Sequence, residues 1–344
     1  MALEFQTLSL FVLVALKRDS AYSTEAGLKY FVLGALSSGL FLFGCALLYG
    51  LTGEVSIQEI ILVTGDLGGD LGGVLITIAL LFKLSAVPFH MWAPDVYEGA
   101  PTLITALLAL IPKVAIMGIL VQIGVVMNLI LLCAVLSIIY GAIAALNQTR
   151  VKRLLAYSGI SHMGFILLGL AVGTFESIQA SYIYLIIYLV MSIGGFSMVM
   201  YLNLRRGLII EMAGLSRENP VLAISLGLTF LAIAGIPPLV GFLSKWLLLL
   251  SAVSAGYYLI SIVAVISSVV AGVYYVRIVK IIYFQTGSSL FIWQSILHRE
   301  RCFNRALALR LSTLMGGSFY LIIFLMMCPN LLMQITHEAT LSLY

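Results

Sequence analysis

Long apolar runs separated by short polar connections dominate the chain. Most of these runs have at least the roughly 17–25 residues that a helix needs to cross a bilayer. They cover residues 29–51, 72–95, 101–122, 125–147, 152–173, 178–203, 220–250, 255–284 and 304–329. A further run, residues 1–16, is shorter than a span and begins at the first residue, so we expect the second half of a divided helix there. The pattern predicts an all-α polytopic membrane protein with about ten transmembrane helices.

Composition excludes a soluble fold. Of the 344 residues, 62% are hydrophobic and only 9% are charged, whereas roughly a quarter of the residues of a soluble domain are charged. The chain contains no CxxC pair and no glycine-rich phosphate loop, which argues against an iron–sulfur, zinc or nucleotide site. We therefore expect neither a cofactor nor a metal in this chain, and any redox chemistry in partner subunits. We also expect no nucleic-acid partner.

Basic residues gather in alternate connections, which is the distribution that marks the cytoplasmic or matrix side of a membrane. They are Lys17, Arg18, Lys29, Arg150, Lys152, Arg153, Arg205, Arg206, Arg217, Arg277, Lys280, Arg299, Arg301 and Arg305. The opposite connections carry Glu54, Glu59, Asp66, Asp70 and Glu176. One connection on the basic side is acidic, with Asp95 and Glu98. Because the basic connections outnumber it, we expect them to face the matrix and the C-terminus to face the intermembrane space.

Five ionisable side chains fall inside the apolar runs: Glu4, Lys83, Lys113, His162 and Lys245. Each costs roughly 2.5–3.5 kcal/mol on insertion scales for lysine and acidic residues, so such positions are functional candidates. A single lysine could instead extend its ammonium group to the interface, a histidine could be a hydrogen-bonded core residue, and Glu4 could be an exposed terminal carboxylate. Three lysines in three separate spans favour a function.

Two of these lysines accompany prolines that interrupt a span. Lys83 precedes Pro88 by five residues, and Lys245 follows Pro237 and Pro238. Proline removes a backbone donor, and the carbonyls freed at that depth need protein or water as partners. A packing kink explains either proline alone. A lysine beside a proline in two corresponding spans indicates inverted repeats with the working site at the breaks.

Proton relay is the chemistry that suits such an array. A low-dielectric environment disfavours the charged form of a lysine, so the side chain can load and release a proton, and a nearby carboxylate stabilises the charged form again. A metal-ion site would need clustered carboxylates or carbonyls, and the spans hold a single carboxylate, Glu4.

Six stretches resemble a known family. They are LEFQTLSLFVL, STEAGLKYFVLGALSSGLFLFG, FKLSAVPFHMWAPDVYEGAPT, IPKVAIMG, QTRVKRLLAYSGISHMGF and AGIPPLVGFLSKW. They resemble subunit 2 of respiratory complex I, NADH:ubiquinone oxidoreductase, over essentially the whole chain. The resemblance implies a proton-pumping subunit of that enzyme in the mitochondrial inner membrane, related to Mrp-type antiporter subunits. It also implies one antiporter-like domain, 1–344, built from an incomplete first repeat, 1–122, a second repeat, 125–284, and an interfacial loop and last helix, 285–344.

The resemblance also implies roles for the five side chains. Glu4 matches the family's glutamate and Lys83 its lysine partner, Lys113 the central relay lysine, and Lys245 the lysine of the second broken helix; His162 matches a histidine near the central polar axis. The expected partners are other membrane-arm subunits of the complex and lipids such as cardiolipin. FMN, iron–sulfur clusters and ubiquinone are expected in partner subunits. A second short chain is expected to supply helices that precede Met1.

Two other functions stay open from the sequence. The chain could be an Mrp-type cation/proton antiporter subunit, or a structural membrane spacer without transport activity. A spacer predicts that removing Lys83 or Lys245 leaves proton pumping intact.

Overall fold

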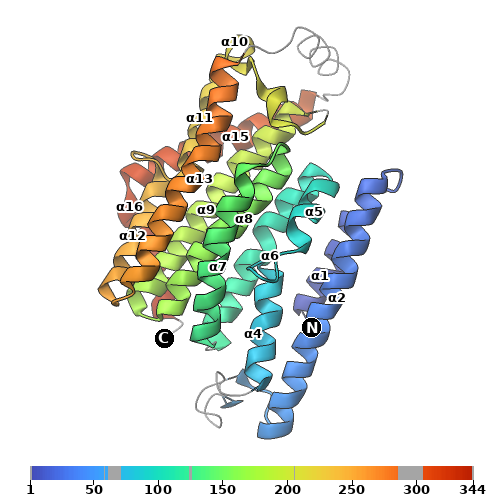
Figure 1. The fold of residues 1–344 in the computed structure, drawn as a ribbon, viewed down its shortest axis with the longest axis vertical. Coiled ribbons are helices and arrows are strands. Elements are labelled where there is room, and N and C mark those ends of the chain that lie inside the picture. The colour runs from blue at the N-terminus through green and yellow to red at the C-terminus, as the bar shows by residue number, and fades with distance from the viewer. Residues whose placement is uncertain are drawn as a thin grey trace.

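The structure, a computed structural model, describes residues 2–57, 59–60, 71–123, 126–204, 206–285 and 305–342, with the side chains of 305–308 excepted. Within these ranges the chain is helical apart from short connections (Figure 1). Seven of the described helices are long and apolar enough to cross a membrane. They are α2 (Ala21–Thr52), α6 (Thr102–Ile123), α7 (Met127–Leu146), α8 (Val151–Val172), α9 (Phe175–Leu202), α13 (Tyr258–Phe284) and α15 (Arg305–Met327).

Four shorter apolar helices accompany these spans: α1 (Ala2–Val14), α4 (Leu71–Lys83), α11 (Pro220–Ala234) and α12 (Val240–Ser254). The helix α5 (Trp92–Gly99) continues from α4 after a non-helical stretch, and α12 continues from α11 in the same way. The expected all-α polytopic fold with two broken helices is therefore confirmed. The boundaries proposed for the two repeats stay a prediction.

The helices follow one another across the molecule. Figure 1 shows α1 and α2 at one edge, α4 and α6 beside them, α7, α8 and α9 in the middle, and α11, α12 and α13 at the far side. The helix α8 is the innermost, since 94% of its apolar window is buried. Small residues let it approach α7 closely: a Cβ atom at Gly164 of α8 would lie 2.4 Å from Ser137 Oγ of α7.

The first break places a lysine at the end of a helix. The helix α4 ends at Lys83, and residues 84–91, which include the cis Val87–Pro88 peptide bond, separate it from α5. The Phe82 carbonyl accepts hydrogen bonds of 3.0 Å from the Ser85 backbone N–H and of 2.9 Å from the Trp92 indole N–H at the start of α5. The Trp92 side chain thus connects the start of α5 to the end of α4.

At the second break, too, a side chain that follows the break bonds to a carbonyl that precedes it. The helix α11 ends at Ala234 and is followed by Gly235, whose φ of +82° suits glycine. The helix α12 begins at Val240, after the cis Pro237–Pro238 bond. The Lys245 ammonium of α12 donates a hydrogen bond of 2.7 Å to the Ala234 carbonyl at the end of α11.

Gly241→Ala is expected to disturb this second break. A Cβ atom at Gly241 would lie 1.8 Å from the Ala232 carbonyl oxygen of α11, so the two half-helices would have to separate. Overpacking of this kind costs about 1–3 kcal/mol or more, and we expect a lower thermal stability and a lower yield of the assembled protein. The matched control is Gly272→Ala in α13, where a Cβ atom meets nothing within 4 Å among the described residues. Equal stability of the two variants would contradict this packing.

The helices α2 and α16 differ from the prediction. The helix α2 begins at Ala21 rather than 29, because its polar first turns continue the helix beyond the apolar run and carry a Glu25–Lys29 ion pair one turn apart. The helix α16 (Pro329–Leu341) was not predicted. It is too polar for a span, but its one-sided contacts through Leu332, Thr336 and Thr340 make it a helix that lies against α9.

Some predictions lie outside the described residues. These include the interfacial loop at 285–303 beyond residue 285, with Trp293, His298, Arg299 and Arg301, and the acidic positions Asp66 and Asp70.

Candidate functional site

Glu4 and Lys83 form an ion pair between α1 and α4. The Lys83 ammonium nitrogen lies 2.8 Å from Glu4 Oε1, and the two side chains are 8% and 27% exposed, respectively. Ser38 of α2 donates a hydrogen bond of 2.6 Å to the other carboxylate oxygen of Glu4. The carboxylate is therefore held by two other helices and is not a free terminal group, as one interpretation of the sequence allowed.

Lys113 lies at the centre of the molecule and has a neutral partner. Its side chain projects from α6, the residue is 3% exposed, and its ammonium donates a hydrogen bond of 2.9 Å to the hydroxyl of Tyr188 on α9. The same nitrogen lies 4.8 Å from the centroid of the Tyr188 ring, close enough for a cation–π interaction. Pro112, its neighbour in sequence, lies inside α6, which remains a single helix.

His162 projects from α8 toward the same tyrosine-bearing face of α9. Its Nδ1 atom lies 2.8 Å from the Tyr184 hydroxyl, in a hydrogen bond whose direction depends on the imidazole tautomer. The rings of His162 and Tyr188 are 5.4 Å apart. The imidazole is 3% exposed and lies within electrostatic range of both Lys113 and Lys245.

Lys245 caps the end of a helix. Besides its bond to the Ala234 carbonyl, its ammonium lies 5.6 Å from the centroid of the Phe165 ring of α8, and the residue is 7% exposed. Because the C-terminal end of a helix carries partial negative charge, α11 stabilises a cation at this point. Gly235 provides the space, since a Cβ atom there would lie 2.9 Å from Lys245 Nζ.

The five predicted side chains thus fall into two groups. Glu4 and Lys83 form one group near the edge of the molecule, and Lys113, His162 and Lys245 form the other among α6, α8, α9 and α12. In the described part of the chain, no hydrogen bond joins Lys83 to Lys113. Pro88, Pro237 and Pro238 lie in the two breaks, exposed at the surface of the described residues.

Tyr184 and Tyr188 were not predicted as site residues. Both lie in the run SYIYLIIYLVMS, where tyrosines four residues apart occupy one face of a helix. That spacing was the available signal. An ordinary aromatic core position gives the same pattern, so the sequence alone does not distinguish the two roles.

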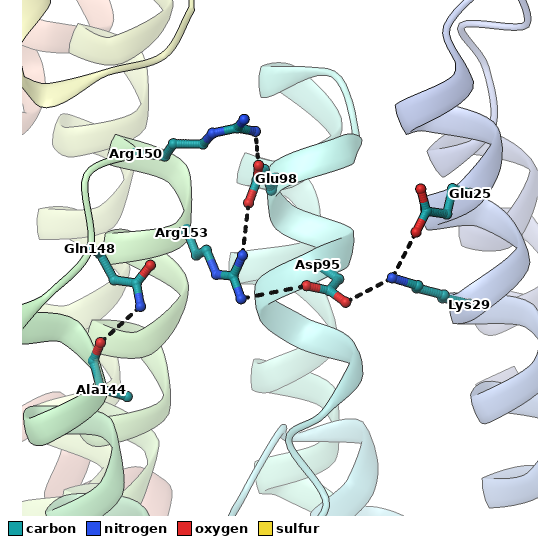
Figure 2. Close-up of polar contacts among 8 residues, drawn as sticks. All are labelled: Glu25, Lys29, Asp95, Glu98, Ala144, Gln148, Arg150 and Arg153. Atoms are coloured by element: carbon teal, nitrogen blue, oxygen red, sulfur yellow. Dashed lines mark hydrogen bonds and ion pairs between the residues drawn. The ribbon is translucent and has the colours of Figure 1, made fainter.

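Asp95 and Glu98, the acidic exception among the basic connections, form ion pairs with basic residues of neighbouring helices. Figure 2 shows Asp95 between Lys29 of α2 and Arg153 of α8, with N–O distances of 2.9 and 3.9 Å. Glu98 contacts Arg150 and also Arg153, the latter at 3.5 Å. The two carboxylates therefore neutralise basic residues at their own end of the molecule, which explains why an acidic connection is found there.

Glu98→Gln is expected to loosen the attachment of α5 to α8. The Glu98 side chain is only 18% exposed, and its loss leaves Arg150 without an ion-pair partner and Arg153 with the longer contact to Asp95. Because the Arg150 and Arg153 side chains are 43% and 38% exposed, water replaces part of the lost contact. We therefore expect a thermal stability of the assembled protein lower by about 1 kcal/mol, the upper end for exposed ion pairs. Glu25→Gln is the matched control, because that carboxylate is 61% exposed and exposed pairs contribute little. A larger loss for Glu25→Gln would contradict the assignment.

The described residues contain no group of three or more His, Cys, Asp or Glu side chains that could hold a metal ion. What this arrangement can do chemically is hold and exchange protons. Its ionisable side chains are buried, they lie on separate helices, and they have hydroxyl, carbonyl or carboxylate partners at hydrogen-bond distance.

Comparison with known proteins gives consistent matches. Residues 1–271 match the family model described as NADH:quinone oxidoreductase/Mrp antiporter, TM. The chain is 58% identical to NADH-ubiquinone oxidoreductase chain 2 of Metridium senile, over 100% of this chain and 91% of that protein.

Two solved structures share the fold. One is respiratory complex I from Thermus thermophilus with bound aureothin, at a TM-score of 0.81 and 29% identity over 97% of this chain and 73% of that one. The other is the Mrp complex from Dietzia sp. DQ12-45-1b, at a TM-score of 0.85 and 21% identity over 99% and 73% of the two chains. The second likeness concerns the fold alone.

Proposed function

Since the chain belongs to the family of NADH:quinone oxidoreductase and Mrp antiporter transmembrane subunits, we propose that its buried side chains carry protons across the membrane. The chain is a multi-pass membrane subunit of the mitochondrial type of NADH:ubiquinone oxidoreductase, and we propose that quinone reduction occurs in partner subunits. The observation that supports the proton path best is the central group, in which Lys113, His162 and Lys245 are buried and contact no carboxylate among the described residues.

The Glu4–Lys83 ion pair is the first element of the proposed path. A carboxylate 2.8 Å from the ammonium stabilises its charged form. Separating the two groups removes that stabilisation in a low-dielectric environment and favours release of a proton from Lys83 Nζ. Because Lys83 is the last residue of α4, movement of the break at 84–91 changes this separation. The ion pair can thus act as a switch between holding and releasing a proton.

The central group is the second element. The charge on Lys113 acts on His162, and so does the charge on Lys245, so a proton gained or lost at one lysine alters the energy of a proton on the imidazole. Lys245 keeps its hydrogen bond to the Ala234 carbonyl in either state, because a neutral amine still has N–H donors. The site therefore accommodates both protonation states without losing the partner of that carbonyl.

The orientation of the chain in the membrane and its partners complete the proposal. We propose that the basic connections face the matrix and the C-terminus the intermembrane space, following the positive-inside distribution. FMN, iron–sulfur clusters and ubiquinone are proposed for partner subunits of the complex. A short chain with additional N-terminal helices, and lipids such as cardiolipin, stay predictions, as do the repeats at 1–122 and 125–284.

The experiment that tests the function follows NADH-driven acidification in membrane vesicles that contain the assembled complex. We expect the same rate of proton transport with Na⁺ and with choline as the added cation, because the described residues offer no carboxylate cluster for a metal ion. The shared fold with the Mrp complex makes cation/proton antiport the second candidate. Proton transport that requires Na⁺, with uptake of labelled Na⁺, would support that candidate instead.

A further inference from the structure

Two tyrosines on one face of α9 bind two different groups of the central site. Tyr188 accepts a hydrogen bond from Lys113 at 2.9 Å, and Tyr184, one helical turn earlier, shares a hydrogen bond of 2.8 Å with His162. Tyr184 is 1% exposed and Tyr188 is 5% exposed. The Tyr188 ring also lies 5.4 Å from the His162 ring, so α9 contacts both groups at once.

We propose that Tyr184 and Tyr188 are positioning residues that hold His162 and Lys113 in the orientation required for proton exchange between α6 and α8. This role rests on the proposed proton path. It adds a function for α9, a helix that carries none of the predicted relay side chains. The two hydroxyl groups are the parts of the tyrosines that perform this role, because they make the hydrogen bonds to Lys113 and His162. For packing alone, the rings would suffice.

The neutral partner suits a lysine that must give up its proton. A carboxylate at hydrogen-bond distance would favour the charged form of the ammonium group. A phenol hydroxyl can accept a hydrogen bond from the ammonium and can donate one to the neutral amine. Tyr188 therefore orients Lys113 in both protonation states without fixing one of them.

The packing around this contact leaves room for little besides the two side chains. At Gly159 of α8, a Cβ atom would lie 3.2 Å from the Tyr188 hydroxyl and 3.3 Å from the Lys113 nitrogen. Glycine thus lets the backbone of α8 approach the point where the groups from α6 and α9 meet. The Tyr184 ring stacks on Phe165 of α8 with centroids 5.9 Å apart, which fixes the direction of its hydroxyl toward His162.

The test compares Tyr188→Phe, Tyr184→Phe and the double variant in the assembled complex. Phenylalanine keeps the ring and removes only the hydroxyl. We expect each single variant to lower NADH-driven proton transport about tenfold, the effect of losing a hydrogen bond to a charged or reacting group. We expect the double variant to lose little more, because both hydroxyls serve the same exchange and their effects are then not additive. The solvent deuterium isotope effect on transport should rise, since proton exchange becomes the slow step.

Three reference arms make the outcome decisive. Tyr30→Phe removes the hydroxyl of another buried tyrosine, whose ring packs on Phe11 and Trp92, and should leave transport and the isotope effect unchanged. Native electrophoresis measures assembly, so that transport is expressed per assembled complex. Lys113→Met tests the proposed function itself. If Lys113→Met stops transport while both phenylalanine variants transport protons normally with an unchanged isotope effect, the tyrosines only pack, and this inference is wrong while the proposed function stands.

Discussion

Replacing Lys113 by methionine is expected to stop NADH-driven proton transport through this chain while the complex still assembles. Methionine fills a similar volume and carries no charge, so removing a side chain that is 3% exposed leaves no unpaired buried charge behind. Tyr188 loses its nitrogen partner, but its hydroxyl is neutral. Transport should fall by a factor of about 100 or more, in the range measured for loss of a positioned proton-transfer group. The rate of acidification in vesicles, per assembled complex, measures this loss.

The control for this variant is Lys280→Met, which removes an exposed lysine on α13. It should leave the transport rate unchanged, which separates the effect of Lys113 from a general effect of lost positive charge. Normal transport in the Lys113→Met complex would mean that the buried lysine is a structural residue, and it would favour the spacer hypothesis.

Variants of the Glu4–Lys83 ion pair should show that its contribution to thermal stability is distinct from its contribution to proton transport. Glu4→Gln leaves the Lys83 ammonium, whose side chain is 8% exposed, without its counter-charge. Breaking a buried pair by removing one partner costs about 3–5 kcal/mol, and the partial exposure of Glu4 places this case near the lower figure. We expect the Glu4→Gln complex to be less stable to heat and to transport protons poorly.

Combining Glu4→Gln with Lys83→Met removes both charges. Replacement of a whole buried pair by neutral residues is often harmless to stability, so the double variant should recover thermal stability and assembly. It should still fail to transport protons, because the switch is gone. A double variant that is stable and transports normally would show that the pair is only a structural contact between α1 and α4.

Much of the fold could be predicted from the hydrophobic pattern because the bilayer sets the length of each span. The break between α11 and α12 followed from Pro237 and Pro238, which interrupt a helix, and from Gly235, which readily adopts a positive φ. The side chains that bond to the carbonyls at the breaks could not be predicted. Trp92 donates a hydrogen bond at one break and Lys245 at the other. Which side chain does so depends on how the half-helices pack, and local sequence does not specify this packing.

The candidate site could be predicted only in part, since charge in an apolar run is visible in a sequence and a neutral partner is not. Glu4 and Lys83 are 79 residues apart and Lys113 and Tyr188 are 75 apart, so no local spacing connects them. Asp95 and Glu98 illustrate the same limit. In the sequence, these two acidic residues are an exception among the basic connections on one side of the membrane. The structure explains the exception, because both carboxylates form ion pairs with the basic residues Lys29, Arg150 and Arg153.

The proposed function is that the buried side chains of this chain carry protons whose transport is driven by NADH oxidation. The most direct measurement is the number of protons transported per NADH oxidised, determined in vesicles with the Lys113→Met complex and with the unsubstituted complex. We expect a lower ratio for the variant, because the path through α6, α8 and α12 is interrupted. An unchanged ratio at an unchanged rate of NADH oxidation would contradict it.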